Sequence, residues 1–383
     1  MNPVSAMLVI GTRPEAIKMA PLAIECHKRA ADIKTTICIS GQHRQMLAGV
    51  LEYFGVRADR ELAVMAAGQS LAALAGRCLT ELDVAIGQLR PDCVIAQGDT
   101  TTVMCAALAA FFHRIAFVHV EAGLRTGDLH APWPEELNRR VATLAASLHC
   151  APTRQAADRL RNEGVSPADI HVTGNTVVDA LQWTLTRERA RSSQWSEKFA
   201  FLGERPLVLI TGHRRENFGQ GLANLCEAIS RLATRFPDVA FVYPVHLNPE
   251  VHSAVHARLA GRDNVRLLPP LPYPEFVWLM DRARVIVTDS GGIQEEAPTL
   301  GKPVLVTRAM TERPEGLGNA IELVGTDVAR IIARVAAHLA ASEPTLQPGT
   351  NPYGDGHAAA RIAELIASRA WERTELNRSR AAS

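Results

Sequence analysis

The sequence predicts an α/β protein built from two doubly wound, parallel-sheet (Rossmann-like) domains. Short apolar runs alternate with longer segments of helical pattern, an order typical of parallel sheets covered by helices. The alternation comes in two successive series, and 383 residues exceed what one hydrophobic core usually serves. We therefore expect a first domain over residues 1–174, rejoined by the C-terminal helix at about 366–383, and a second domain over residues 175–365.

The overall composition is that of an ordinary globular protein, with 47% hydrophobic and 21% charged residues. A net charge of +1 argues against a nucleic-acid partner or a role on a membrane surface. No apolar run is long enough to insert into a bilayer, and the first ten residues lack the basic start of a signal peptide. The seven cysteines are scattered without a C-x-x-C pair, as in reduced proteins. We expect a cytoplasmic protein that binds neither nucleic acid nor membrane.

In the first series, each expected strand is a short apolar run that ends in a turn. The strands are expected at residues 7–10, 35–40, 93–96, 115–120, 148–150 and 170–172. After the first strand, Thr12 and Glu15 have the spacing of a capping box that opens a helix. Arg13 and Lys18 place two cations beside that helix N-terminus, which suits a pyrophosphate. The alternative is that Arg13 and Lys18 are ordinary surface residues that bind no ligand.

Acidic residues follow several of these segments. Asp99 lies in the turn after one expected strand and Glu121 directly follows the next, and ligands of doubly wound sheets bind at the carboxyl ends of the strands. We therefore expect both near a ligand, with a helix-capping role as the alternative. Glu135 and Glu136 open a helix after two prolines. Because helix N-termini favour acidic residues, one of these two glutamates can be purely structural.

The second series contains a glycine-rich turn between a strand and a helix. Its strands are expected at residues 207–210, 239–243, 265–268, 283–287 and 303–306, after a crossing point at residues 174–176. The turn Ser290-Gly291-Gly292 lets a phosphate approach backbone N–H groups at a helix N-terminus. Glu296 follows one helical turn later, where its carboxylate could accept hydrogen bonds from a ribose. The alternative is a helix whose N-cap is Ser290.

No metal or covalent nucleophile is expected. His213 and Glu216 have H-x-x-E spacing, but no second histidine completes a set of zinc ligands. Ser290 lacks the G-x-S-x-G pattern of a nucleophilic serine.

Taken together and in order, the motifs resemble those of the non-hydrolysing bacterial UDP-N-acetylglucosamine 2-epimerases. The resemblance runs from residue 7 to about residue 366 and is carried by residues 11–18, 98–102, 119–127, 134–136, 211–216 and 288–298. It implies a glycosyltransferase-B architecture with the nucleotide sugar in the cleft between domains. It also implies reversible conversion of UDP-N-acetylglucosamine to UDP-N-acetylmannosamine by a homodimer, without an added cofactor, in the supply of amino sugars for surface polysaccharides.

The resemblance also implies roles for individual residues. The catalytic residues it implies are Asp99, Glu121, Glu135 and His213, the last close to the diphosphate. The substrate-binding residues it implies are Arg13, Lys18, Leu271, Phe276, Ser290, Gly291, Gly292, Glu296 and Arg313. A second, allosteric UDP-N-acetylglucosamine site of regulated members corresponds to Gln42, His43, Gln45, Arg214 and His246. This chain departs from other members at Leu271, where a polar residue is common, and at Gly68, where some have arginine.

The chemistry explains why carboxylates and cations occur together. The proton on carbon 2 is not acidic while UDP stays attached, so we expect UDP to leave as the proton leaves, giving a glycal. Protonation from the other face and return of UDP then yield the epimer. A general acid and a general base each accelerate such a reaction by about 10²- to 10⁴-fold. One preorganised donor to the departing pyrophosphate is worth roughly 3 kcal/mol. The choice of base stays open between Asp99 and Glu121.

Four alternatives remain at this stage. A glycosyltransferase would use the same nucleotide site but would need an acceptor. A hydrolysing epimerase would release free N-acetylmannosamine, and a sister epimerase would act on a diacetamido uronic acid sugar. An inactive UDP-sugar sensor need not keep Asp99, Glu121 and Glu135, all of which are present.

Overall fold

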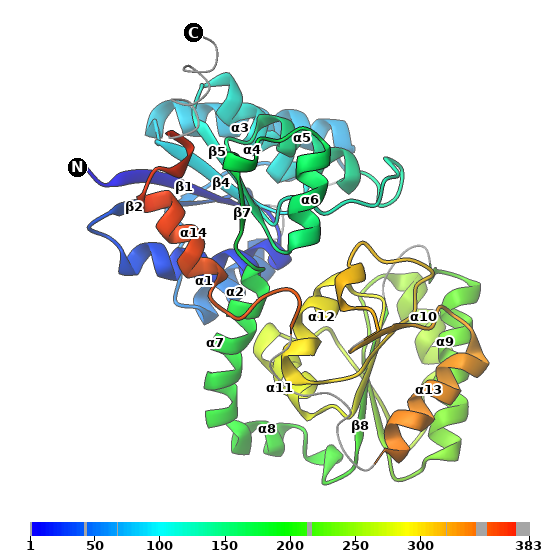
Figure 1. Cartoon of the computed structure of the whole chain (residues 1–383). Helices are drawn as coiled ribbons and strands as arrows, with labels where there is room; N and C mark the ends of the chain where they lie inside the picture. Colours follow the sequence, from blue (N-terminus) through cyan, green and yellow to red (C-terminus); the bar gives the residue numbers. More distant parts are fainter. Residues whose placement is uncertain are drawn as a thin grey trace. The chain divides into compact units, whose positions relative to one another are not determined.

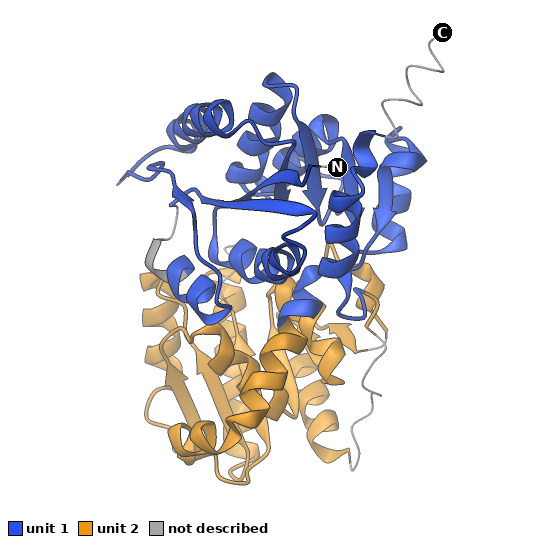
Figure 2. Ribbon diagram, turned by 90° about the vertical axis from the view of Figure 1, so that its left-hand side faces the viewer, with its two compact units in different colours: residues 1–180, 353–383 blue, residues 181–352 orange. Residues whose placement is uncertain are grey.

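The protein is described here by a computed structural model. Its described residues are 2–41, 44–66, 68–212, 217–318, 320–341 and 351–372, with the side chains of 44–46 left aside. The chain divides into two compact units, Met1–Ala180 with Tyr353–Ser383, and Leu181–Pro352 (Figure 2). The chain leaves the first unit within one helix, Thr176–Ala190, and returns to it at Tyr353.

The first unit contains a parallel sheet, seven-stranded in the described residues, in the order β3-β2-β1-β4-β5-β6-β7. Its strands are β1 (Val4–Ile10), β2 (Ile33–Ile39), β3 (Arg60–Glu61), β4 (Cys93–Gln97), β5 (Ala116–Val120), β6 (Leu148–Ala151) and β7 (Ile170–Val172). The strand order reverses between β1 and β4. In such sheets the ligand site lies at this reversal, outside the carboxyl ends of the strands.

Helices cover both faces of this sheet (Figure 1). They are α1 (Arg13–Lys28), α2 (Arg44–Tyr53), α3 (Leu71–Leu89), α4 (Thr101–Phe112), α5 (Glu135–Ala145), α6 (Arg154–Asn162), α14 (Ala358–Ala367) and a 3-10 turn, η1 (Pro167–Asp169). The neighbours α3, α4 and α5 pack on one face, and α1 packs with α14 on the other. Side-chain caps start several of them, as Thr12 does for α1 and Thr100 for α4.

The second unit repeats the arrangement with a parallel sheet, six-stranded in the described residues, in the order β10-β9-β8-β11-β12-β13. Its strands are β8 (Leu207–Thr211), β9 (Ala240–Pro244), β10 (Val265–Leu268), β11 (Val285–Thr288), β12 (Val304–Val306) and β13 (Ile321–Leu323). Here the order reverses between β8 and β11, so the turns after these two strands are the expected ligand site.

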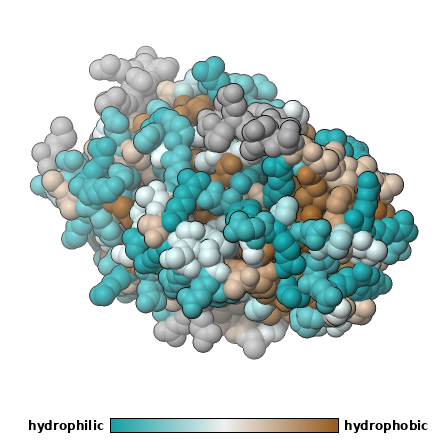
Figure 3. Space-filling model, turned by 90° about the horizontal axis from the view of Figure 1, so that it is seen from below, coloured by the Kyte–Doolittle hydropathy of each residue, from teal (hydrophilic) through white to brown (hydrophobic). Residues whose placement is uncertain are grey.

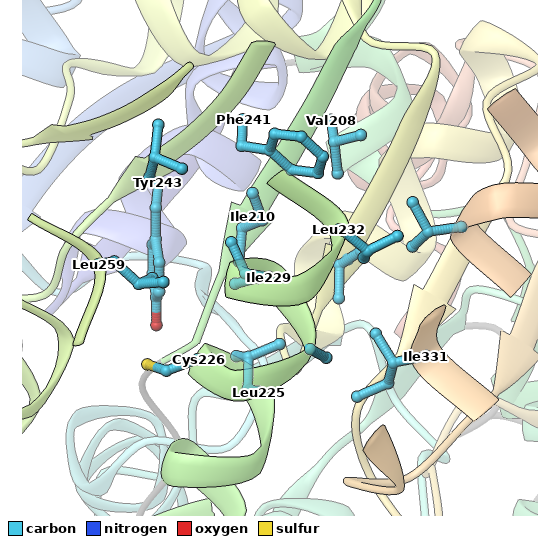
Figure 4. Packing of buried hydrophobic residues seen from close by; sticks show 14 of the residues in the cluster. Val208, Ile210, Leu225, Cys226, Ile229, Leu232, Phe241, Tyr243, Leu259 and Ile331 are labelled. Atoms are coloured by element: carbon cyan, nitrogen blue, oxygen red, sulfur yellow. The ribbon is translucent and has the colours of Figure 1, made fainter. Parts of the chain in front are cut away.

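Several helices of the second unit bury apolar residues against its sheet. The helices of this unit are α7 (Thr176–Ala190), which begins in the first unit, α8 (Ser192–Lys198), α9 (Gln220–Arg235), α10 (Pro249–Leu259), α11 (Tyr273–Arg282), α12 (Gly291–Glu296), α13 (Val328–Ala340) and the 3-10 turns η2 (Ala200–Leu202), η4 (Ala297–Leu300) and η5 (Pro314–Gly316). Figure 4 shows Ile229 and Leu232 of α9 against Ile210 and Phe241 of the sheet, with Ile331 of α13 nearby. Full burial of each such side chain contributes about 2 kcal/mol.

The architecture confirms the predicted fold class. Central strands of parallel sheets are buried on both faces and are therefore continuous apolar runs, which is why the sequence shows them clearly. The structure adds two edge strands that the sequence analysis did not predict, β3 with two residues and β13 with three. Both are too short to carry a periodic pattern.

No helix of the described chain is long and apolar enough to cross a membrane. One face, seen from below, carries mostly hydrophilic side chains with hydrophobic ones scattered among them (Figure 3). All seven cysteines are buried and none forms a disulfide.

Candidate active site

In the first unit, the turn after β1 is closed by a carboxylate of the same helix. Glu15 Oε2 accepts hydrogen bonds from the backbone N–H groups of Gly11 and Thr12, both at 2.6 Å. Its Oε1 accepts from the Thr100 hydroxyl at 2.5 Å, which joins the turn after β1 to the turn after β4. The predicted capping box of Thr12 and Glu15 is confirmed. The turn N–H groups are thus already bonded to protein, so an anion bound here has to be held by side chains.

The carboxyl group of Glu15 is almost completely buried. Burial raises its pKa to about 7, although the hydrogen bonds from Thr100, Thr12 and Gly11 lower it. Gly11 is required for this close fit, since a Cβ at this position would lie 2.4 Å from Thr102 Oγ1.

Lys18 and Glu121, both predicted site residues, form a buried ion pair. Lys18 Nζ lies 2.5 Å from Glu121 Oε2, with exposed side-chain fractions of 9% and 6%. The amides of Gln97 and Asn175 donate to the same oxygen at 3.0 and 3.1 Å. Glu121 follows β5 with a φ of 63°, a left-handed conformation that non-glycine residues adopt chiefly where the surroundings hold them. Arg13 is the first residue of α1 and is half-buried.

Asp99 follows β4 and is paired with an arginine of α5. Arg139 Nη2 lies 2.5 Å from Asp99 Oδ2, and the Asn138 amide donates to the Asp99 carbonyl oxygen at 2.9 Å. Arg139 is buried, whereas 28% of the Asp99 side chain is exposed. Asp99 therefore keeps access to a ligand. The sequence analysis did not single out Asn138 or Arg139, although both stand within three residues of the motif Pro134-Glu135-Glu136.

The structure distinguishes the two glutamates at the start of α5. Glu136 is fully buried, and its carboxylate accepts from the Thr126 backbone N–H and from Arg140, each at 3.1 Å. Arg139 lies 3.4 Å from it as well. These contacts give Glu136 the structural role. Glu135 is half-buried and stays the catalytic candidate.

Behind Asp99 lies a histidine that the sequence analysis did not select. His119 is buried in β5 and its Nε2 donates to the Gly98 carbonyl oxygen at 2.8 Å. Burial lowers its pKa to about 4, and the nearby Arg125 and Arg139 act in the same direction. His119 is thus a neutral imidazole that holds the peptide preceding Asp99.

In the second unit, the Ser-Gly-Gly turn opens helix α12. Ser290 occupies the N-cap position of α12, but its side chain makes no capping hydrogen bond there. Its backbone N–H donates to Thr288 Oγ1 at 3.0 Å, and that hydroxyl lies 2.6 Å from Thr211 Oγ1. The turn therefore lies between the ends of β8 and β11, at the reversal of the strand order. Capping by the Ser290 side chain, the alternative considered from the sequence, does not occur.

Arg313 lies directly over this turn. A Cβ at Gly291 would lie 2.5 Å from Arg313 Nη1, so a side chain at this position would force the guanidinium to move. Arg313 Nε donates to Glu295 at 2.6 Å, and its Nη1 donates to Glu312 at 2.5 Å. Arg308 pairs with Glu312 in turn, at 2.8 Å. All four charged side chains are buried, so the guanidinium is held in one orientation.

The predicted uridine-binding residues gather around the start of α11. The Tyr273 hydroxyl donates to Glu296 Oε1 at 2.7 Å, and both residues are buried. Leu271, which is buried, precedes Tyr273, and the half-buried Phe276 follows it. The sequence analysis missed Tyr273 because nothing in its local pattern indicates a partner 23 residues away.

Four predicted residues and one predicted side chain fall outside the described part of the chain. His213, Arg214, Gln42 and His43 lie outside the described residues, as does the side chain of Gln45. His246 is exposed, and its Nδ1 accepts from the Asn248 backbone N–H at 3.1 Å. No group of three or more metal-ligating side chains occurs in the part of the chain that the structure describes.

The chain contains two parallel, doubly wound units. At the reversal of the strand order, the first unit carries carboxylates and the second a glycine turn with an arginine. These features define a glycosyltransferase-B type α/β enzyme. The family model for UDP-N-acetylglucosamine 2-epimerase matches residues 25–367. The chain belongs to the UDP-N-acetylglucosamine 2-epimerase family of isomerases, which confirms the family predicted from the sequence.

Known proteins similar to this chain agree with that assignment. A probable UDP-N-acetylglucosamine 2-epimerase of Ralstonia nicotianae is 46% identical over 94% of this chain and 98% of its own. The Salmonella typhimurium UDP-N-acetylglucosamine 2-epimerase is 45% identical with the same coverage. The crystal structure of the Neisseria meningitidis UDP-GlcNAc 2-epimerase bound to UDP-GlcNAc has a TM-score of 0.91 and 42% identity. It covers 95% of this chain and 100% of that one.

Proposed function

We propose that this protein interconverts UDP-N-acetylglucosamine and UDP-N-acetylmannosamine by inverting carbon 2, without hydrolysing the product and without an added cofactor. The observation that carries the proposal is the pairing of Lys18 with Glu121, both predicted from sequence, in a buried ion pair of the first unit. Asp99 follows the neighbouring strand β4. The Neisseria meningitidis relative was crystallised with UDP-GlcNAc, which supports the choice of substrate.

The first unit would carry out the proton transfers. A carboxylate takes the proton from carbon 2 while the bonding pair of the anomeric C–O bond leaves with UDP, which gives 2-acetamidoglucal. Another group then returns a proton to the opposite face of carbon 2, and UDP adds again at carbon 1. The side chain of Asp99 is 28% exposed and that of Glu121 only 6%, which favours Asp99 as the group that meets the sugar. Glu135 and Glu121 remain the candidates for the opposite face.

The second unit would hold UDP while it departs and returns. Arg313, the Ser290 hydroxyl and the N–H groups of Gly291 and Gly292 are the donors proposed for the diphosphate. Glu296, held by Tyr273, would accept from the ribose, and Leu271 with Phe276 would lie near the uracil. His213 and Arg13 complete the proposed diphosphate site. Donors that are already fixed stabilise the leaving group without reorganising, which is worth roughly 3 kcal/mol for one donor.

Further parts of the proposal concern the assembly, the location and the pathway. We propose a homodimer, supported by exposed aromatic side chains at the end of α4, Phe111 and Phe112, and by Leu144 on the adjoining α5. The buried, unpaired cysteines fit a reducing, cytoplasmic location. The product would supply amino sugars for surface polysaccharides. A second UDP-N-acetylglucosamine would bind at Gln42, His43, Gln45, Arg214 and His246.

The test is incubation of the protein with UDP-N-acetylglucosamine alone in deuterated water. We expect both epimers to appear, each with deuterium at carbon 2. Both epimers without deuterium would contradict the elimination route. Release of free N-acetylmannosamine would show a hydrolysing enzyme, and an unchanged substrate that reacts only after an acceptor is added would show a glycosyltransferase.

A further inference from the structure

Glu121 receives a hydrogen bond from a residue at the exit of the first unit. Asn175 stands between β7 and α7 and is 2% exposed. Its Nδ2 donates to Glu121 Oε2 at 3.1 Å. Gln97, the other amide donor to this oxygen, belongs to β4 in the middle of the sheet.

Asn175 also contacts both segments that connect the two units. Its Oδ1 accepts from the Val177 backbone N–H at 3.1 Å and so caps α7, the helix in which the chain leaves the first unit. Its backbone N–H donates at 2.7 Å to the carbonyl oxygen of Tyr353, the first residue after the chain returns. Because both ends of its amide group are bonded, the side chain has one available orientation.

Further contacts hold the two segments together around Asn175. Asp179 of α7 accepts from the backbone N–H groups of Ala358 and Ala359 at 3.2 and 2.9 Å, and so caps α14. Arg361 of α14 donates to the Thr173 carbonyl oxygen at 3.1 Å. The exit and return segments therefore form one bonded cluster, and Asn175 is the member that contacts Glu121.

We infer that Asn175 is a positioning residue that ties the orientation of the Glu121 carboxylate to the two segments joining the units. The inference rests on the proposed function for the role of Glu121. A shift of either segment moves the Asn175 amide, whereas the donor Gln97 stays with β4 in the middle of the sheet. Because misplacing a reacting group by about 1 Å can cost about 100-fold in rate, a small change in this cluster is sufficient to control catalysis.

The first test replaces the amide but keeps the helix cap. Asn175→Ser retains a capping oxygen for α7 and removes the donor to Glu121. We expect kcat to fall about 100-fold with KM and the Kd for UDP unchanged. Ser70→Ala, which removes the cap of α3 at a distance from Glu121, serves as the control and should lower only the melting temperature. Wild-type kcat in Asn175→Ser, or an equal loss of kcat in the control, would overturn the inference.

The second test asks whether Asn175 acts through Glu121 and through the joining segments. In the Glu121→Gln background, Asn175→Ser should add no further loss to the rate of deuterium incorporation at carbon 2. Asp179→Asn, which weakens the cap of α14, should lower kcat in the wild type but not in Asn175→Ser. If Asp179→Asn lowered kcat equally in the wild type and in Asn175→Ser, the joining segments would not act through Asn175. A wild-type protein that makes no epimer would refute the proposed function instead, since these comparisons require an active parent.

Discussion

The two units share one topology but use the turn at the strand-order reversal in opposite ways. In the first unit, Glu15 fills the turn after β1 by accepting from Gly11 and Thr12, and it reaches across to Thr100 after β4. In the second unit, Ser290 leaves the N-terminus of α12 without a side-chain cap, and Arg313 lies over Gly291.

This difference shows that the fold sets where a ligand site can form, at the reversal of the strand order, and that the side chains there decide its chemistry. A turn already filled by a carboxylate cannot use its N–H groups for phosphate, so the role proposed for the first unit rests on the side chains of Asp99, Glu121 and Lys18. A turn without a cap, beside a fixed guanidinium, suits a diphosphate. The comparison is the basis for proposing proton transfer in one unit and leaving-group binding in the other.

The largest effect should come from removing a carboxylate of the first unit. Asp99→Asn and Glu121→Gln keep the shape of the side chains but cannot exchange a proton, so we expect kcat to fall by about a thousandfold or more. Binding of UDP, measured by calorimetry, should stay at the wild-type level because neither carboxylate is a proposed donor to UDP. A variant that loses UDP binding and turnover together would break this division of roles.

The next largest effect concerns Glu15 and pH. Burial raises its pKa from 4.5 to about 7 in the folded protein, so between these values the folded state binds more protons than the unfolded chain. The contribution to stability is present in full below pH 4.5 and is lost as the pH rises through 7. The loss amounts to about 3 kcal/mol.

Urea unfolding of the wild type and of Glu15→Gln, at pH 4.5 and at pH 8, measures this contribution. The glutamine keeps an acceptor for the turn but cannot ionise. We therefore expect the variant to gain about 3 kcal/mol relative to the wild type on going to the higher pH. Parallel pH dependences would show that Glu15 is already ionised and that the turn is closed by a charged group.

The sequence predicted the sheets and the strand-end residues, but not the partners of those residues. Asp99 and Glu121 could be found because they lie in the turns that follow buried apolar strands, and strand ends are where such sheets bind ligands. Arg139 and Asn175 could not, because their contacts with these carboxylates join residues 40 and 54 positions apart and exist only once the fold brings the segments together. Likewise, only burial distinguishes Glu136 from Glu135.

A smaller effect is expected from a substitution of Gly291, because a side chain at this position of the second unit would collide with Arg313. The methyl group of Gly291→Ala would lie 2.5 Å from Arg313 Nη1 and would displace the guanidinium. The loss of a charged hydrogen bond of about 2 kcal/mol should weaken UDP binding about thirtyfold. Gly292→Ala is the matched comparison, since its nearest neighbour, Ser290 Oγ, lies 3.9 Å away and the loss should be much smaller. Similar losses at both glycines would mean that Arg313 does not contribute to the site.

The smallest effect is expected from removing the hydroxyl group at the N-terminus of α1 or of α12. Thr12→Ala removes a side-chain cap that α1 uses, and should lower the free energy of unfolding by about 1 kcal/mol. Ser290→Ala removes a hydroxyl that caps nothing in α12, so its stability should stay within a few tenths of a kcal/mol of the wild type, while UDP binds more weakly. Urea unfolding and calorimetry with UDP measure both properties for each variant. If Ser290→Ala lost as much stability as Thr12→Ala, the serine would be a structural cap, and the contrast between a filled and an open turn would be wrong.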